Sequence, residues 1–181
     1  GKSELVRQSI RDRDDAVYYQ AVQGTATTQL ARFVEAASTA YPGITDVRED
    51  WEPLLRYPAE RDAVVVIDEF PYLIDTDESV PSIIQHFWDT GIDDSEATLV
   101  LTGSAIGMMH THVLDGGAPL YGRVSQTPNG RIELAQLPFE TVQEFVPGYG
   151  PEDRVFVYGV FGGTPRYLRP IDPDATLGEN V

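Results

Sequence analysis

The sequence predicts an α/β fold built around a parallel β-sheet. Short runs of β-branched or aromatic residues alternate with amphipathic helical segments from about residue 1 to residue 137, which is the pattern of βαβ units. Two of the runs, 63–67 (AVVVI) and 97–102 (ATLVLT), are almost continuously apolar, as strands covered on both faces are. Only helical patterns follow Pro138. We therefore expect a sheet domain over residues 1–137 and the start of a helical lid subdomain over residues 138–181.

Local periodicity places the individual elements. Strands are expected at 16–20, 63–67 and 97–102, and a fourth at 131–137 (RIELAQL), where apolar and polar residues alternate. Helices are expected where apolar residues recur at helical spacing, over 4–13, 27–41, 51–56, 79–90, 105–114, 139–146 and 152–161. The segment 115–130 is rich in Gly and Pro and is expected to be a loop.

The charge is strongly acidic, with 29 Asp and Glu against 13 Lys and Arg and a formal net charge of −16. Lys2 is the single lysine. The acids are spread along a chain that keeps its aromatic residues, so the composition predicts a folded protein with an acidic surface and not a disordered tail. High salt screens the self-repulsion of such a surface, and we expect a salt-loving source organism. The same negative charge disfavours binding of these residues to a nucleic-acid backbone.

Cysteine usage and hydropathy exclude several classes. The chain has no cysteine, which excludes disulfides and thiolate metal sites. No apolar run approaches the roughly 20 residues that a membrane-spanning helix needs, and the N-terminus has no signal-peptide pattern. The sequence therefore predicts a cytoplasmic protein without membrane contact.

Gly1-Lys2-Ser3 opens the first predicted helix and has the form of the last three residues of a phosphate-binding loop, G-x-x-x-x-G-K-[ST], the Walker A motif. In that loop, backbone N–H groups and the helix N-terminus hold phosphate oxygens, the lysine reaches the β- and γ-phosphates, and the hydroxyl binds Mg²⁺. The preceding strand, first glycine and loop are missing, so we interpret the chain as N-terminally truncated within the motif. An exposed polar N-terminus is the alternative.

Asp68 and Glu69 follow the buried strand and form a Walker B pattern. Asp68 would hold the Mg²⁺ shell through water, and Glu69 would orient and deprotonate the attacking water as general base. The alternative is a core strand that ends in solvated acids. The position of the two acids, on a strand of an alternating α/β chain that begins with Gly-Lys-Ser, favours the functional interpretation.

The strand 97–102 ends in Thr102-Gly103-Ser104. Because the carboxyl ends of neighbouring parallel strands meet at one sheet edge, these hydroxyls would lie beside Asp68. Thr102 and Ser104 are both candidates for the sensor position that contacts the catalytic water or the γ-phosphate. A strand followed by a glycine turn is the alternative.

The succession GKSEL, VVVIDEFPYL, LVLTGSAIGMM, PLYGR and GVFGGTPRYL resembles the archaeal ATPase family, a branch of the STAND-type signal-transduction ATPases within the AAA-like group. The likeness runs from Gly1 to about Leu168. It implies a P-loop NTPase three-layer sandwich with a five-stranded parallel sheet, whose first strand is missing here, followed by the start of a helical lid. It also implies ATP and Mg²⁺ as ligands, with hydrolysis serving as a slow regulatory switch.

Three further positions gain a role from this resemblance. Arg123, in PLYGR, matches an arginine that faces the γ-phosphate, where a guanidinium would stabilise charge on the transferring phosphoryl group. Gly163 and Pro165 resemble the GxP motif of the STAND lid, which packs near the adenine. The alternatives are a surface arginine in a loop and a Gly-Pro helix boundary.

A second function class stays open beside the ATPase. Without the first half of the phosphate-binding loop, the chain would be a catalytically dead fragment or interaction domain that keeps the P-loop fold. Relatives continue into a winged-helix region and a further domain, so a protein or DNA partner would be bound through regions outside this chain. Self-association is also left open.

Overall fold

The computed structural model describes residues 1–91, 95–126 and 130–180. These residues divide into two compact units, Lys2–Ile132 and Glu133–Val181, and Gly1 groups with the second unit. Each unit has its own hydrophobic core, and each is described by itself.

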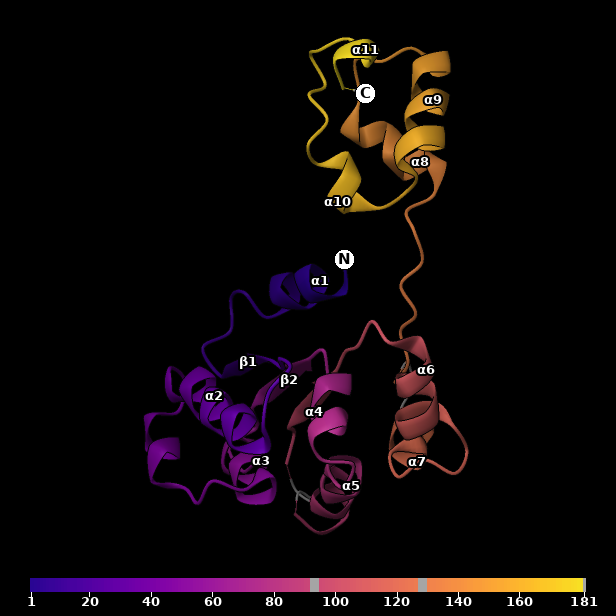
Figure 1. Cartoon of the computed structure of the whole chain (residues 1–181). Helices are drawn as coiled ribbons and strands as arrows, with labels where there is room; N and C mark the ends of the chain where they lie inside the picture. The colour runs from indigo at the N-terminus through magenta and orange to yellow at the C-terminus, as the bar shows by residue number, and fades with distance from the viewer. Residues whose placement is uncertain (92–94, 127–129, 181) are drawn as a thin grey trace. The chain divides into compact units, whose positions relative to one another are not determined.

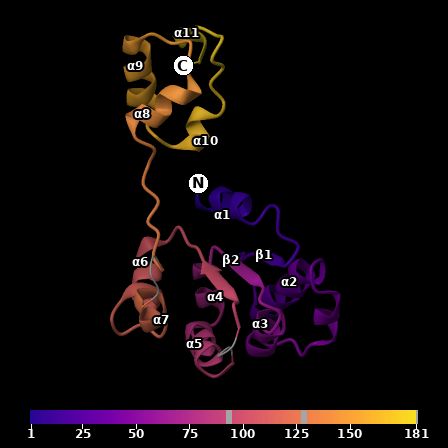
Figure 2. The same ribbon diagram turned by 180° about the vertical axis from the view of Figure 1, so that it is seen from behind.

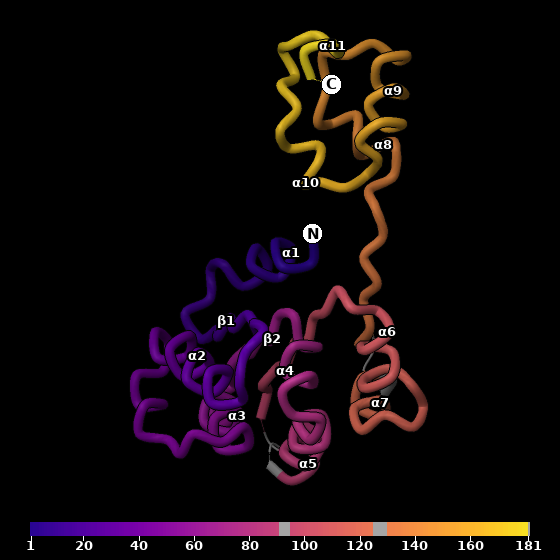
Figure 3. The backbone as a smooth tube through the Cα atoms, in the orientation of Figure 1, coloured from indigo at the N-terminus to yellow at the C-terminus, as the bar shows by residue number. Residues whose placement is uncertain are grey.

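The first unit alternates helices with strands, as the sequence predicts. Its elements are α1 (Lys2–Ser9), β1 (Ala16–Gln20), α2 (Ala26–Ser38), η1 (Pro42–Asp46), α3 (Trp51–Ala59), β2 (Val64–Asp68), α4 (Pro71–Thr76), α5 (Val80–Gly91), β3 (Thr98–Leu101), α6 (Ile106–Met109), η2 (His110–Leu114) and α7 (Tyr121–Gln126). Figure 3 traces this path along the chain.

The three described strands form a parallel sheet in the order β1-β2-β3, which confirms the predicted α/β class. Gln20 pairs with Asp68, and Ile67 pairs with Leu101. Parallel pairing requires a crossover segment between consecutive strands, and the helices α2 to α5 supply these crossovers. All three strands therefore end at the same edge of the sheet, and Asp68, the last residue of β2, lies at this edge.

Side-chain alternation along the strands divides the sheet into two faces. Val17 and Tyr19 of β1 are buried on the face that α2 and α3 cover, where the Tyr19 ring packs edge-on against Phe33 at 5.6 Å between centroids. Tyr18 points to the opposite face and meets Arg7 of α1, whose guanidinium lies 4.5 Å from the ring centroid. Figures 1 and 2 show the same arrangement, with α1 on one side of the sheet and α2 and α3 on the other.

Three expectations about elements are wrong. The segment 131–137 is not a strand but irregular chain. Alternation alone does not make a strand, because its backbone groups need a partner strand, and the described sheet gives none to this segment, so that Ile132 is 73% exposed. The described sheet accordingly has three strands and not the four expected in this chain, which was expected to lack the first strand of the five-stranded sheet. The expected loop 115–130 contains the helix α7, and its residues 127–129 lie outside the described part of the chain.

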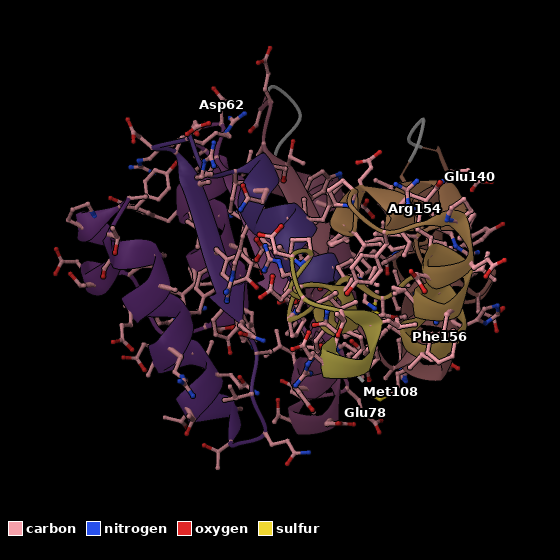
Figure 4. The ribbon with its side chains drawn as sticks, turned by 90° about the horizontal axis from the view of Figure 1, so that it is seen from above. Asp62, Glu78, Met108, Glu140, Arg154 and Phe156 are labelled. Carbon is pink, nitrogen blue, oxygen red and sulfur yellow. The ribbon has the colours of Figure 1, made fainter. Side chains whose placement is uncertain are left out.

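The second unit is helical throughout its described residues, with α8 (Phe139–Val142), η3 (Gln143–Phe145), α9 (Pro151–Phe161), α10 (Pro165–Leu168) and α11 (Leu177–Asn180). The helices expected at 139–146 and 152–161 are thereby confirmed. A small core of Val142, Val146, Tyr149, Val157, Leu168 and Ile171 holds the unit together. Arg154 of α9 (Figure 4) donates to the carbonyl oxygen of Pro147 at 2.7 Å and fixes the turn before the helix.

Two glycines end α9 and turn the chain toward α10. Gly162 has a φ of +62°, in the left-handed region that glycine adopts at low cost. The next residue, Gly163, accepts a hydrogen bond from the amide of Leu137 at 2.8 Å, and a Cβ atom on it would lie only 1.9 Å from the Leu137 carbonyl oxygen. The Gly-Gly pair is therefore explained by backbone packing within this unit.

Candidate functional site

The candidate site lies at the carboxyl ends of β2 and β3, where the first helix also arrives. Asp68 ends β2 and is only 1% exposed, and Thr102 directly follows β3 and is 8% exposed. Backbone hydrogen bonds lock the two strand ends in register: the Thr102 amide donates to Ile67 and the Phe70 amide donates to Thr102, at 3.0 and 2.8 Å. The positions of these side chains are thus fixed by the sheet.

Hydrogen-bond donors surround the carboxylate of Asp68. The hydroxyl of Thr102 and the backbone amide of Glu69 (3.1 Å) donate to Oδ1, and the phenol of Tyr18 donates to Oδ2 at 2.5 Å. Ser3, in the first turn of α1, lies near this carboxylate and contributes to lowering the pKa of Asp68.

The ionisation of Asp68 follows from this shell. Burial by itself would raise the pKa of Asp68, because a charged carboxylate is poorly solvated inside the protein. The hydrogen bonds from Thr102, Tyr18 and the Glu69 amide, together with the nearby Ser3 hydroxyl, act in the opposite direction and outweigh burial, leaving the pKa below its usual value. The side chain is therefore a carboxylate at neutral pH.

Glu69 occupies an unusual backbone position one residue further. Its φ is +56°, in the left-handed region that non-glycine residues seldom adopt. This conformation turns the side chain toward the loop after β3, where Glu69 Oε1 accepts from the Ser104 hydroxyl at 2.9 Å and Oε2 accepts from the Ser104 amide at 3.2 Å. Strained backbone that the surrounding structure holds in place is common at functional sites.

Gly103 sets the path of the chain between Thr102 and Ser104. A Cβ atom at this position would lie 2.7 Å from Pro71 Cδ and 2.9 Å from the Met109 side chain. The loop can therefore pass between α4 and α6 only with glycine at this position. Along this path Ser104 lies within hydrogen-bonding distance of Glu69.

Tyr18 belongs to the site but sequence reasoning missed it. Tyr18 pairs with Val66 in the sheet register, so its side chain shares a face with Asp68 two residues along β2. Burial, followed by the hydrogen bond to Asp68, raises the pKa of the Tyr18 phenol, which is a donor at neutral pH. The sequence pattern that could have identified Tyr18 is the strand alternation, which puts Tyr18 and Tyr19 on opposite faces of the sheet.

The donor set suits Mg²⁺. The Ser3 hydroxyl near Asp68 has two lone pairs, and hard oxygen ligands such as this hydroxyl and the Asp68 carboxylate are what Mg²⁺ prefers. The described part of the chain contains no cluster of three or more His, Cys, Asp or Glu side chains that would hold a metal alone. In nucleotide sites Mg²⁺ takes one or two protein oxygens and completes its shell with phosphates and water.

Comparison with known proteins identifies the group to which this arrangement belongs. Residues 1–171 match the sequence model of an ATPase domain found predominantly in Archaea. The chain belongs to this archaeal ATPase domain family. The resemblance seen in its motifs is thereby confirmed at the level of the family, and the family predicts ATP as the nucleotide and hydrolysis as the reaction.

Two proteins illustrate what this ATPase domain is similar to. The uncharacterized protein MJECL04 of Methanocaldococcus jannaschii is 34% identical over 171 residues, which cover 94% of this chain and 37% of that protein. The Walker-type ATPase PABY2304 of Pyrococcus abyssi shares the fold, with a TM-score of 0.67 at 16% identity over 93% of this chain and 57% of that chain. The chain thus spans just over a third of the first protein and just over half of the second.

The structure of the ATPase domain brings together five of the residues predicted from sequence, namely Ser3, Asp68, Glu69, Thr102 and Ser104. Lys2 is half-exposed in the first turn of α1, one residue before Ser3. Gly1 precedes α1, whose amide groups open the helix as those of a phosphate-binding loop would.

Arg123 forms a bidentate ion pair elsewhere in the same unit. Its guanidinium binds both carboxylate oxygens of Asp89 on α5, with Nε to Oδ1 at 2.9 Å, and also donates to the carbonyl oxygen of Pro119 at 3.2 Å. Gly163 and Pro165 lie in the second unit, with Pro165 at the first position of α10. None of the helices in the described part of the chain combines the length and apolarity of a transmembrane segment.

Proposed function

We propose that this ATPase domain binds ATP together with Mg²⁺ and hydrolyses it at the carboxyl ends of β2 and β3. The single observation that carries the proposal is the buried carboxylate of Asp68 at the end of β2, which accepts hydrogen bonds from Thr102, Tyr18 and the Glu69 amide. The Gly-Lys-Ser sequence at the start of α1 lies near it, since Ser3 contributes to the lowered pKa of Asp68. A metal ion coordinated by the Ser3 hydroxyl would lie next to a buried carboxylate that stays ionised.

The ligand-binding roles follow from the chemistry of each group. Gly1 and the first amides of α1 would hold phosphate oxygens, and the Lys2 ammonium would neutralise the β- and γ-phosphates. Ser3 would coordinate Mg²⁺, and Asp68 would hold the waters of its shell. When bound, the ion would screen the negative charge that develops on the phosphate oxygens.

Glu69 would serve as the general base. A carboxylate at the strand edge, one residue beyond Asp68, would take a proton from water that attacks the γ-phosphate. Ser104 orients this carboxylate through two hydrogen bonds, and Thr102 orients Asp68. Both sensor candidates thus act through the acids that they bind. Arg123 would stabilise the transferring phosphoryl group only after leaving Asp89.

The wider role that we propose is a regulatory switch of the STAND type. Residues 1–137 would form the nucleotide-binding domain and residues 138–181 the start of the lid, in which Gly163 and Pro165 would pack near the adenine. The acidic composition supports a salt-loving source, and we place the domain in the cytoplasm. Self-association, or a protein or DNA partner bound outside these residues, would couple the switch to its process.

Replacing Lys2 tests the nucleotide site. We expect Lys2→Ala to weaken ATP binding by about 10- to 100-fold, because hydrogen bonds to charged groups contribute roughly 1.5–3 kcal/mol. The measurement is calorimetric titration of the full-length protein with ATP in Mg²⁺ and high salt. Arg11→Ala is the matched control, since it removes one positive charge whose side chain is 67% exposed. Equal affinities in wild type and Lys2→Ala, or no binding by either, would favour the interaction domain.

A further inference from the structure

The first helix, α1, carries the proposed phosphate ligands and has little apolar packing of its own. None of its residues, Lys2–Ser9, is buried, and Leu5 is 50% exposed. A helix of this length is marginal in water and depends on tertiary contacts for its stability. The side chains through which α1 contacts the sheet therefore decide how Lys2 and Ser3 are oriented.

Arg7 provides such contacts from the last turn of α1. Its guanidinium lies over the ring of Tyr18, with 4.5 Å between the guanidinium carbon and the ring centroid, and its Nη2 donates to Gln20 Oε1 at 3.5 Å. Tyr18 and Gln20 are two residues apart on β1, so their side chains point to the same face of the sheet. Arg7 thus connects α1 to this face at two positions.

Tyr18 is itself held by the sheet. Its backbone pairs with Val66 of β2, and its phenol donates to Asp68 Oδ2 at 2.5 Å. The half-buried ring is therefore a fixed surface against which Arg7 packs. A cation over the face of such a ring is attracted by the negative charge density of that face.

Ser3 and Arg7 lie on one face of α1, because residues four apart are neighbours on the surface of a helix. That face is directed at the sheet, since Arg7 stacks on Tyr18 and Ser3 lies near Asp68. Lys2 and Arg7 are only about 7.5 Å apart along the helix axis, at about 1.5 Å per residue. The contact of Arg7 in the last turn therefore sets the rotation of the helix at its first turn.

We propose that the contact between Arg7 and Tyr18 orients α1 for binding the phosphates of the nucleotide. This inference rests on the proposed function, in which Lys2 and Ser3 of the same helix are the phosphate and metal ligands. Arg7 and Tyr18 are positioning residues, because they act through the first turn of α1 and not through contacts of their own with the nucleotide.

Arg7→Ala removes the guanidinium, and Tyr18→Leu removes the ring. Each should weaken binding of a fluorescent ATP analogue to the full-length protein in EDTA by about 2- to 5-fold, the effect of one cation–π contact at an exposed site. EDTA is chosen because the contact acts on the phosphate-binding helix and not on the metal. The double variant should bind no more weakly than the weaker single variant, since both changes remove the same contact.

Two variants serve as matched controls and should bind the analogue in EDTA as the wild type does. Tyr18→Phe removes the hydroxyl and keeps the ring over which Arg7 lies. Arg11→Ala removes the same charge as Arg7→Ala from a side chain that is 67% exposed and lies beyond the end of α1.

Amide hydrogen exchange gives a readout without nucleotide. In Arg7→Ala and in Tyr18→Leu the amides of α1 should exchange about 2- to 5-fold faster, while those of β1 and β2 keep the wild-type rates. A merely structural role of Tyr18 in the sheet would instead speed exchange in both strands. Arg7 is exposed on the helix, so Arg7→Ala keeps the test decisive even where Tyr18→Leu disturbs β1.

The outcomes separate this inference from the proposed function. Wild-type affinity and wild-type exchange of α1 in Arg7→Ala, or losses that add in the double variant, would overturn the role of the contact. Weaker binding by Lys2→Ala in the same assay would then leave the ATP site standing. A wild type that does not bind the analogue would overturn the proposed function, and with it this inference.

Discussion

Replacing Glu69 by glutamine should reduce ATP hydrolysis by about 10²- to 10⁴-fold, the contribution of a positioned general base. The carboxamide has the shape of the carboxylate, and its oxygen can still accept from the Ser104 hydroxyl. It cannot take a proton from water. Binding of ATP should therefore persist while turnover is lost, as expected for a group that acts mainly in the transition state.

Phosphate release under saturating ATP, with binding measured in parallel, checks this expectation. Glu60→Gln is a suitable control, because Glu60 is exposed at the end of α3 and the substitution makes the same chemical change. A Glu69→Gln protein that hydrolyses ATP at the wild-type rate would rule out Glu69 as the base. A protein that loses binding as well would assign Glu69 a structural role.

Replacing Asp68 by alanine should lower the free energy of unfolding by roughly 3 kcal/mol, since buried donors are left without an acceptor. Thr102 and the Glu69 amide are held by the sheet and cannot turn to solvent. Urea unfolding at neutral pH measures the loss. Asp75→Ala, at an exposed position of α4, is the control, because it removes a carboxylate without leaving buried hydrogen-bond donors unpaired.

The effect of Asp68→Ala should also depend on pH. The pKa of Asp68 is lowered in the folded protein by the hydrogen bonds that outweigh its burial. The stability that this group contributes is therefore fully present above the unfolded pKa of about 3.9 and is lost as the pH falls through the lower folded value. The gap between wild type and Asp68→Ala should shrink at acid pH. A gap that stays constant from pH 7 to acid pH would contradict the ionised, hydrogen-bonded carboxylate.

The strands could be predicted because their signal is local. Continuous apolar runs such as 63–67 have to be buried on both faces, and β2 and β3 form where such runs occur. The alternating segment 131–137 carries a weaker signal, because alternation becomes a strand only beside a partner. The exposed side chains of Ile132 and Leu134 show that this condition is not met in the described structure.

The site residues that belong to a sequence motif could be predicted. The contacts that depend on strand register could not. Asp68 and Glu69 follow a recognisable strand, whereas Tyr18 contacts Asp68 diagonally across two neighbouring strands, and these two residues are 50 positions apart along the chain. The left-handed backbone of Glu69 and the fit of Gly103 between Pro71 and Met109 are likewise tertiary facts. The pairing of Arg123 with Asp89 also has no signal in a single sequence.

The most direct test of the ATP site is calorimetric titration of the full-length protein with ATP, in Mg²⁺ and in EDTA, for wild type and Asp68→Asn. We expect Mg²⁺ to strengthen ATP binding by the wild type. Asp68→Asn, which keeps the size of the side chain but loses its charge, should abolish this gain and leave binding in EDTA unchanged. Equal strengthening by Mg²⁺ in both proteins would contradict the assignment of Asp68 to the metal, and with it the proposed site.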